Sequence, residues 1–166
     1  MLGISFFQSF AGTSLLKNGQ PTQQENAQTG EQISAMTVLI SNYKQFKHEW
    51  DNTDYSHAPR AQQAEKAKVG DTVHLVTFFS NCLPDSEQMC SMSFQVNVYQ
   101  NDTLITSSQK VSQQLKKPSG LQMSNLTVGT KFDDNETGDF RYEVTVTDEN
   151  ADDTVLLKTK IKVSPK

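Results

Sequence analysis

Residue types that mark several specialised classes of protein are scarce in this chain. Its 166 residues include only two cysteines, three histidines and one tryptophan, and the 15 lysines and arginines are outnumbered by 19 aspartates and glutamates. The net charge is therefore −4. Phosphate binding needs clustered cations, and no basic stripe with interleaved aromatic residues occurs, so nucleic acid is excluded as a partner. The length fits one domain with a hydrophobic core.

Long hydrophobic runs are also missing. The mean hydropathy is −0.58, and a membrane-spanning helix needs about 20 consecutive apolar residues. The most apolar stretch, MLGISFFQSFA at residues 1–11, ends in the small-x-small pattern Ser9-Phe10-Ala11 but has no positively charged start. We interpret it as the remnant of a signal peptide whose start lies upstream, with a short buried strand as the alternative. A signal peptide implies an exported protein, either periplasmic or extracellular.

The next part of the chain changes from a polar stretch to a structured one. Residues 12–35 contain Gly, Asn, Gln, Thr and Pro without hydrophobic periodicity, which predicts a flexible linker. We expect a single structured domain over residues 36–166. It starts with the β-branched run MTVLIS, whose last residue, with Asn42, can cap a short helix over residues 43–50. One face of that helix is apolar: Tyr43, Phe46 and Trp50.

From Val69 onward the sequence predicts strands. Apolar and polar residues alternate in short segments separated by turn residues, which is typical of a β-sandwich. These segments cover residues 73–79, 92–98, 103–108, 121–128, 140–146 and 155–163. The phase slips by one residue between Met123 and Leu126, which predicts a bulge at Ser124-Asn125. Three lysines of the last strand point outward, as suits an exposed face or edge: Lys158, Lys160 and Lys162.

The series VGDTVHLVTFF, FQVNVYQND, ETGDFRYEVTVTDEN and VLLKTKIKV, within residues 69–164, resembles immunoglobulin-like β-sandwich domains. It is most similar to small secreted bacterial proteins with one such domain and no assigned activity. The resemblance implies a mainly β fold, an antiparallel sandwich preceded here by the short N-terminal helix. Antibody-type domains differ from this chain in having an inter-sheet disulfide and often a tyrosine at the position of Phe140. A fold of this kind implies no particular function.

Cys82 and Cys90 flank the loop LPDSEQM between two predicted strands. Paired strand ends lie about 5 Å apart, which is within reach of a disulfide. The C-x-x-C spacing of redox pairs is absent, and the nearby sequence offers no further pair of zinc ligands. We therefore expect a disulfide that closes this loop, with free thiols as the alternative. A structural disulfide fits an exported protein.

His48, Asp51, Asp54 and His57 follow one another at three-residue intervals. Two imidazoles and two carboxylates are donors that a transition metal accepts. A three-residue step on a helix falls about 60° short of a full turn, so these side chains would converge only in an irregular loop. A polar loop after the helix is the simpler interpretation. A metal-binding protein or metal-dependent enzyme using these four residues is the alternative function.

Acidic residues gather at both ends of the predicted strand 140–146. The first cluster is Asp133, Asp134, Glu136 and Asp139. The strand between the clusters, at about 3.3 Å per residue, is too long for them to share an ion. The second cluster lies at the same end as the cystine loop, where a calcium site is an alternative to a protein contact. We predict partner-binding loops there, formed by Asp85, Glu87, Asp148, Glu149, Asp152 and Asp153.

Catalytic motifs are missing from the sequence. It contains no G-x-S-x-G, no H-E-x-x-H, no P-loop and no dinucleotide-binding glycine fingerprint. His74 falls inside a predicted strand, where packing is the simpler role. We therefore expect a non-enzymatic binding or accessory module of the cell envelope, without a cofactor other than the calcium alternative. Its partner would be a protein or another envelope component.

Overall fold

The computed structural model describes residues 16–17, 20–21, 25–52, 59 and 61–166. Its elements are, in chain order, β1 (Leu16–Lys17), β2 (Gln20–Pro21), β3 (Ala27–Thr29), β4 (Ser34–Ile40), α1 (Tyr43–Asn52), β5 (Lys66–Lys68), β6 (Thr72–Ser80), β7 (Met89–Gln100), β8 (Thr103–Ser107), β9 (Val111–Lys116), β10 (Gln122–Lys131), β11 (Gly138–Asp148) and β12 (Asp153–Ser164). Residues 1–11, expected to be a signal-peptide remnant, lie outside the described part of the chain.

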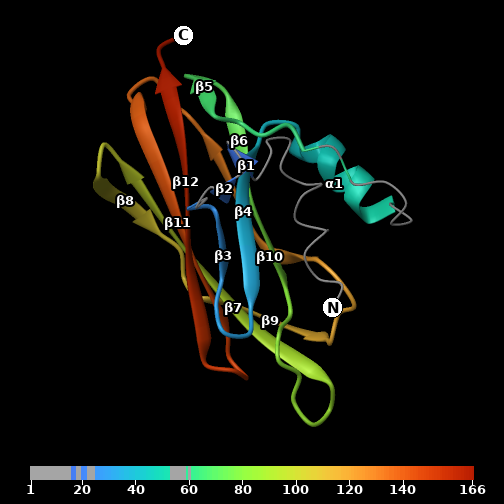
Figure 1. The fold of residues 1–166 in the computed structure, drawn as a ribbon. Coiled ribbons are helices and arrows are strands. Elements are labelled where there is room, and N and C mark those ends of the chain that lie inside the picture. The colour runs from blue at the N-terminus through green and yellow to red at the C-terminus, as the bar shows by residue number, and fades with distance from the viewer. Residues whose placement is uncertain (1–15, 18–19, 22–24, 53–58, 60) are drawn as a thin grey trace.

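Two sheets pack face to face (Figure 1). One has the strand order β10-β6-β4-β3, and the other has the order β5-β12-β11-β7-β8, with β9 also paired to β7. Neighbouring strands in these sheets are antiparallel except β5, which runs parallel to the end of β12. β1 and β2 pair with each other. The chain is thus a mainly β, immunoglobulin-like sandwich with one short helix, as the sequence predicts.

The core between the sheets follows from the alternation in the strands. β11 buries every second residue from Phe140 to Asp148, and β12 does the same from Val155 to Val163. β6 lies between β10 and β4 in its sheet, and most of its residues are buried. One of its faces contributes Leu75 and Phe79 to the core between the sheets, and the other packs Val76 and Phe78 in a cluster with residues of α1. A central strand with two apolar faces is what its sequence predicts.

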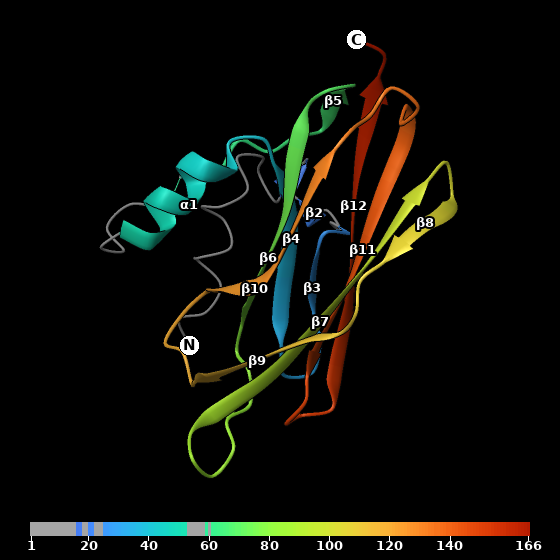
Figure 2. The same ribbon diagram turned by 180° about the vertical axis from the view of Figure 1, so that it is seen from behind.

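A second apolar layer covers the outer face of the four-stranded sheet. Helix α1 lies against this face (Figure 1) and buries Phe46 completely. Trp50 packs on Phe78 of β6 at 5.1 Å between ring centroids, and Tyr43 stacks on His74 at 4.4 Å. The predicted apolar face of the helix is confirmed, and His74 is a packed residue. Among the described residues, no helix covers the outer face of the six-stranded sheet (Figure 2).

Two local predictions have different outcomes. The pairing of β10 with β6 shifts register between Met123 and Thr127, which confirms the bulge expected at Ser124-Asn125. The flexible linker expected over residues 12–35 is wrong for residues 27–35, because β3 and the start of β4 lie there. Ile33 and Ala35 are fully buried in the core. Tertiary burial orders this Gln- and Thr-rich stretch, and its sequence has too few apolar residues to reveal it.

Candidate functional site

The loop between β6 and β7 is closed by a disulfide. Cys82 and Cys90 are bonded, with their Cα atoms 6.0 Å apart, and both are buried. Within the loop, Asp85 organises the backbone: its Oδ1 accepts hydrogen bonds from the N–H groups of Glu87 and Met89, both at 2.9 Å. The loop is therefore shaped by a covalent bond and by its own side-chain contacts. The predicted disulfide is confirmed.

The turn between β11 and β12 is bonded directly to this loop. Asp148 is completely buried, and its Oδ2 accepts a hydrogen bond from the N–H of Leu83 at 2.6 Å. The amide of Asn150 donates from Nδ2 to the carbonyls of Leu83 and Met89, each at 2.9 Å. The sequence predicts the acidic turn and the cystine loop at the same end of the domain, and direct hydrogen bonds join them there.

A third turn, between β3 and β4, belongs to the same group. Oδ2 of Asp153 accepts hydrogen bonds from the N–H groups of Gln32 at 2.7 Å and Ile33 at 3.0 Å. The side-chain amide of Gln32 donates to the carbonyl of Asn81 at 3.1 Å. A Cβ at Gly30 would lie 2.4 Å from Asp153 Oδ1, so a larger residue there would displace this carboxylate from its present position.

We call these three segments, residues 30–33, 81–89 and 148–153, the acidic tip. They lie together at the lower end of the sandwich in Figures 1 and 2. The sequence indicated two of the three segments and missed residues 30–33, because it assigned them to a linker. The signal available in the sequence is Gly30 followed by Glu31, two residues that can form a turn before the apolar run that begins at Ile33.

The carboxylates of the tip fall into two groups. Asp148, Glu149 and Asp153 are engaged by the protein itself: Glu149 binds Lys110 and accepts a hydrogen bond from Ser93, both at 2.5 Å. These contacts lower the pKa of Glu149, and the N–H groups of Gln32 and Ile33 lower that of Asp153. The other group is exposed to solvent and consists of Glu31, Asp85, Glu87 and Asp152, of which Asp85 also accepts the two backbone hydrogen bonds within its own loop.

An exposed apolar side chain lies in the same loop as Asp85 and Glu87. Leu83 in the cystine loop is 39% exposed, although leucine usually lies in the interior. β9 borders the loop on one side, where Lys116 pairs with Met89 and the N–H of Lys117 donates to the carbonyl of Gln88. The tip therefore presents an apolar contact with acidic neighbours and a lysine border. Chemically, this arrangement can bind a complementary surface.

The predicted metal ligands are only partly described. His48 and Asp51 lie on α1, where Asp51 pairs with Lys47 at 2.5 Å and Asn52 hydrogen-bonds the backbone of His48. Asp54 and His57 lie outside the described residues. Within the described part of the chain, no three histidine, cysteine, aspartate or glutamate side chains gather as metal ligands would, either here or at the calcium alternative in the tip. No helix among these residues is long and apolar enough to cross a membrane.

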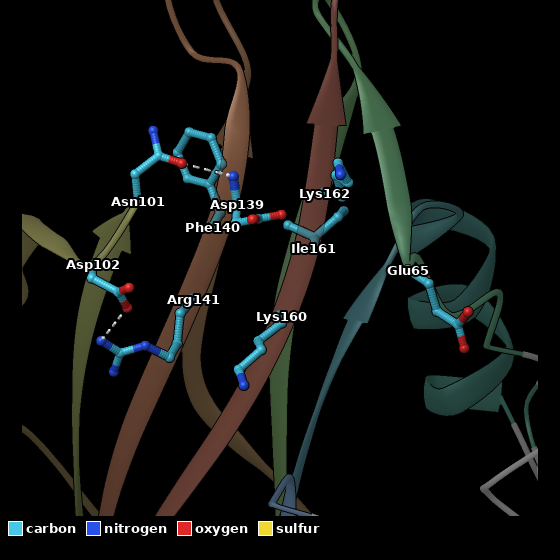
Figure 3. A pocket seen from close by; sticks show the side chains of 9 residues that line it. All are labelled: Glu65, Asn101, Asp102, Asp139, Phe140, Arg141, Lys160, Ile161 and Lys162. Carbon is cyan, nitrogen blue, oxygen red and sulfur yellow. Dashed lines mark hydrogen bonds and ion pairs between the residues drawn. The ribbon is translucent and has the colours of Figure 1, made fainter.

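An open depression of about 550 Å³ lies on the outer face of the six-stranded sheet, away from the tip (Figure 3). Six charged side chains of both signs line it: Glu65, Asp102, Asp139, Arg141, Lys160 and Lys162. Arg141 pairs with Glu143 and Asp102 and stacks 4.1 Å over the ring of Tyr99. Ligand pockets are mostly apolar with a few polar groups. This depression has the opposite character, so the tip is the stronger candidate site.

The fold and the tip together define an immunoglobulin-like β-sandwich domain with a braced set of loops. No family model and no curated protein matches the chain. Among solved structures it is similar to a CARDB domain from Pyrococcus furiosus in complex with di-metal ions, at 16% identity and a TM-score of 0.40, covering 84% of this chain and 100% of that one. It is also similar to the PmoD soluble domain from a Methylocystis species, at 11% identity, a TM-score of 0.36 and coverages of 83% and 96%.

A third similar structure is a family 123 glycoside hydrolase from Clostridium perfringens, at 10% identity and a TM-score of 0.49. That similarity covers 80% of this chain and 27% of the hydrolase, so only a part of the larger protein is matched. At such low identities the similarities concern the fold alone.

Proposed function

We propose that this chain is an exported, non-enzymatic binding module that contacts its partner with the acidic tip. The observation that carries the proposal is the bracing of the tip, in which Asp148, Asn150 and Asp153 bind the backbone of neighbouring segments. Loops on a rigid scaffold commonly carry recognition. A contact surface that is ordered before binding loses less conformational entropy when the complex forms.

The exposed groups of the tip define the chemistry of the partner. Asp85, Glu87 and Asp152 carry carboxylates that face solvent, and Leu83 offers an apolar contact beside them. Interfaces generally combine an apolar centre with a polar rim, and complementary charge speeds the encounter of the partners. The partner is therefore a protein or another envelope component that presents cationic groups around an apolar patch.

The exported location rests on the disulfide. Such bonds form and persist in oxidising compartments, and this one joins two buried cysteines in a chain that has no free cysteine among its described residues. The signal-like segment at residues 1–11 supports the same location. The protein would act in the periplasm or outside the cell.

The test compares two sets of charge-neutralising substitutions with the same change in net charge. One set is Glu31→Gln, Glu87→Gln and Asp152→Asn in the tip, where Asp85 is left unchanged because it holds the backbone of the cystine loop, and the control is Asp133→Asn, Asp134→Asn and Asp139→Asn, three exposed residues away from the tip. Immobilised wild-type and variant proteins capture partners from envelope and extracellular fractions. The tip variant should retain a captured partner roughly tenfold more weakly, and the control should match wild type. Equal retention by all three proteins would contradict the proposal.

A further inference from the structure

Strand β8 is an uncovered edge of the six-stranded sheet. It is the last strand in the order β5-β12-β11-β7-β8 and pairs only with β7. All five of its residues are exposed, including two large aliphatic ones, Leu104 at 52% and Ile105 at 45%. Figures 1 and 2 show β8 on the side of the sandwich opposite α1, standing away from the four-stranded sheet. The backbone groups on its outer side therefore have no strand to pair with in the part of the chain that the structure describes.

The opposite edge of the same sheet carries charged side chains and a covering segment, both of which β8 lacks among the described residues. β5 and β12 carry outward lysines there, among them Lys66 and Lys160, and the carbonyl of Glu25 accepts a hydrogen bond from the N–H of Lys158 at 2.7 Å. Charged side chains and covering segments keep sheet edges from pairing with other chains. β9, which continues along β7, has its backbone covered in part by Asn125, which donates to the carbonyl of Ser112. Residues 103–109, TLITSSQ, contain no charge and no proline.

A second copy of β8 fits this edge. Two identical strands that pair antiparallel form a two-fold symmetric contact in which each surface meets itself. With the axis at Ile105, Thr103 lies opposite Ser107 of the second copy and no like charges meet. The nearest charges on either side are Asp102 and Lys110, which have opposite signs. Antiparallel pairing turns the Asp102 end of one strand toward the Lys110 end of the other.

We propose that two copies of this chain associate through β8, which joins their six-stranded sheets into one continuous sheet. Addition of a strand to an exposed edge is a general mode of recognition. Ile105 is the extra residue of a bulge in the pairing of β8 with β7 and is 45% exposed, and with the axis at this position it lies beside Ile105 of the second copy. A contact of this length buries less accessible surface than a standard protein interface, for which the lower limit is about 1,200 Å², so the dimer is weak.

Analytical ultracentrifugation of the full chain from micromolar to millimolar concentration tests the proposal. The weight-average mass of wild type should rise from 18.6 kDa toward twice that value. Ile105→Lys should remain monomeric at every concentration. Leu156→Lys is the matched control, since Leu156 is equally exposed at 45% but lies on β12, and it should associate like wild type. A monomeric wild type, or equal loss of association in both variants, would overturn the proposal.

A second variant and a second measurement guard against misfolding of the lysine variant. Ile105→Thr keeps a residue that favours strands but removes apolar area, and it should weaken association without abolishing it. Backbone amide shifts of wild type, followed by NMR over the same concentrations, should change at residues 103–107 first. Changes confined to the acidic tip would contradict pairing through β8. If β8 instead paired with a different protein, the mass of the purified chain would stay unchanged at every concentration, which would contradict association of two copies.

Discussion

Strand β7 joins two regions that are organised in opposite ways. Its first residues enter the acidic tip, where a disulfide and hydrogen bonds from Asn150 hold the loop before it. Its last residues lead into the two-residue turn Asn101-Asp102 and the exposed strand β8. The tip is ordered by covalent and polar contacts and by the burial of Ile33 and Cys82, whereas β8 is held by one neighbouring strand. Loop order can therefore be built by side chains that bind backbone groups. We propose recognition for the ordered tip and pairing for the uncovered edge of β8.

The largest effect should come from Asp148, the buried carboxylate of the tip. Asp148→Asn replaces one acceptor oxygen by an amide NH2 group. This group is a donor that faces backbone N–H donors, so we expect a loss of about 3 kcal/mol in the free energy of unfolding. The control is Asp102→Asn at the other end of the molecule, where the carboxylate side chain is 93% exposed. It should change stability by less than about 0.5 kcal/mol. Urea denaturation measures both, and equal effects would mean that the two ends are not organised differently.

Removal of the disulfide should have the next largest effect. The double substitution Cys82→Ser and Cys90→Ser opens a short loop, and the chain-entropy estimate for that loop is about 2.5 kcal/mol. Hydrogen exchange should quicken in residues 83–89 and stay unchanged in β8. If exchange quickens equally across the whole sandwich, the disulfide stabilises the entire fold and not the tip in particular.

The smallest effect should appear on acidification. The N–H groups of Gln32 and Ile33 lower the pKa of Asp153 in the folded protein, so the stabilisation is present above the ordinary pKa near 3.8 and is lost as pH falls through the lower folded value. Protection of the Gln32 and Ile33 amides, measured as exchange relative to the intrinsic rate at each pH, should therefore fall below that pH, ahead of protection in β8. Asp153→Asn should remove this pH-dependent loss of protection at the two amides. An unchanged profile in this variant would show that another group is responsible.

The regular parts of the fold were accessible from the sequence. Alternation identified the long strands β7, β11 and β12, the spacing of Phe46 and Trp50 identified the buried face of α1, and a phase slip located the bulge in β10. These signals work because the period of apolar residues reports the period of the backbone. β3 gave no such signal, since its residues Ala27–Thr29 are short, polar and ordered only by their neighbours.

The site was predictable in position but not in the role of each residue. The cysteine spacing and the acidic turn placed two loops at one end, but an acidic residue in a turn normally suggests a solvent-facing charge. Asp148 and Asp153 instead accept backbone hydrogen bonds, and Asn150 bridges two carbonyls. Such roles depend on which backbone groups the fold leaves unpaired nearby, and a single sequence does not contain that information.

The central claim, that the acidic tip is the recognition surface, is tested most directly by carboxyl footprinting. A carbodiimide-coupled amine labels exposed carboxylates, and mass spectrometry compares the free protein with its complex with the captured partner. The account predicts that labelling of Asp85, Glu87 and Asp152 falls in the complex while labelling of Asp133, Asp134 and Asp139 is unchanged. Protection of the second group with full labelling of the first would contradict it.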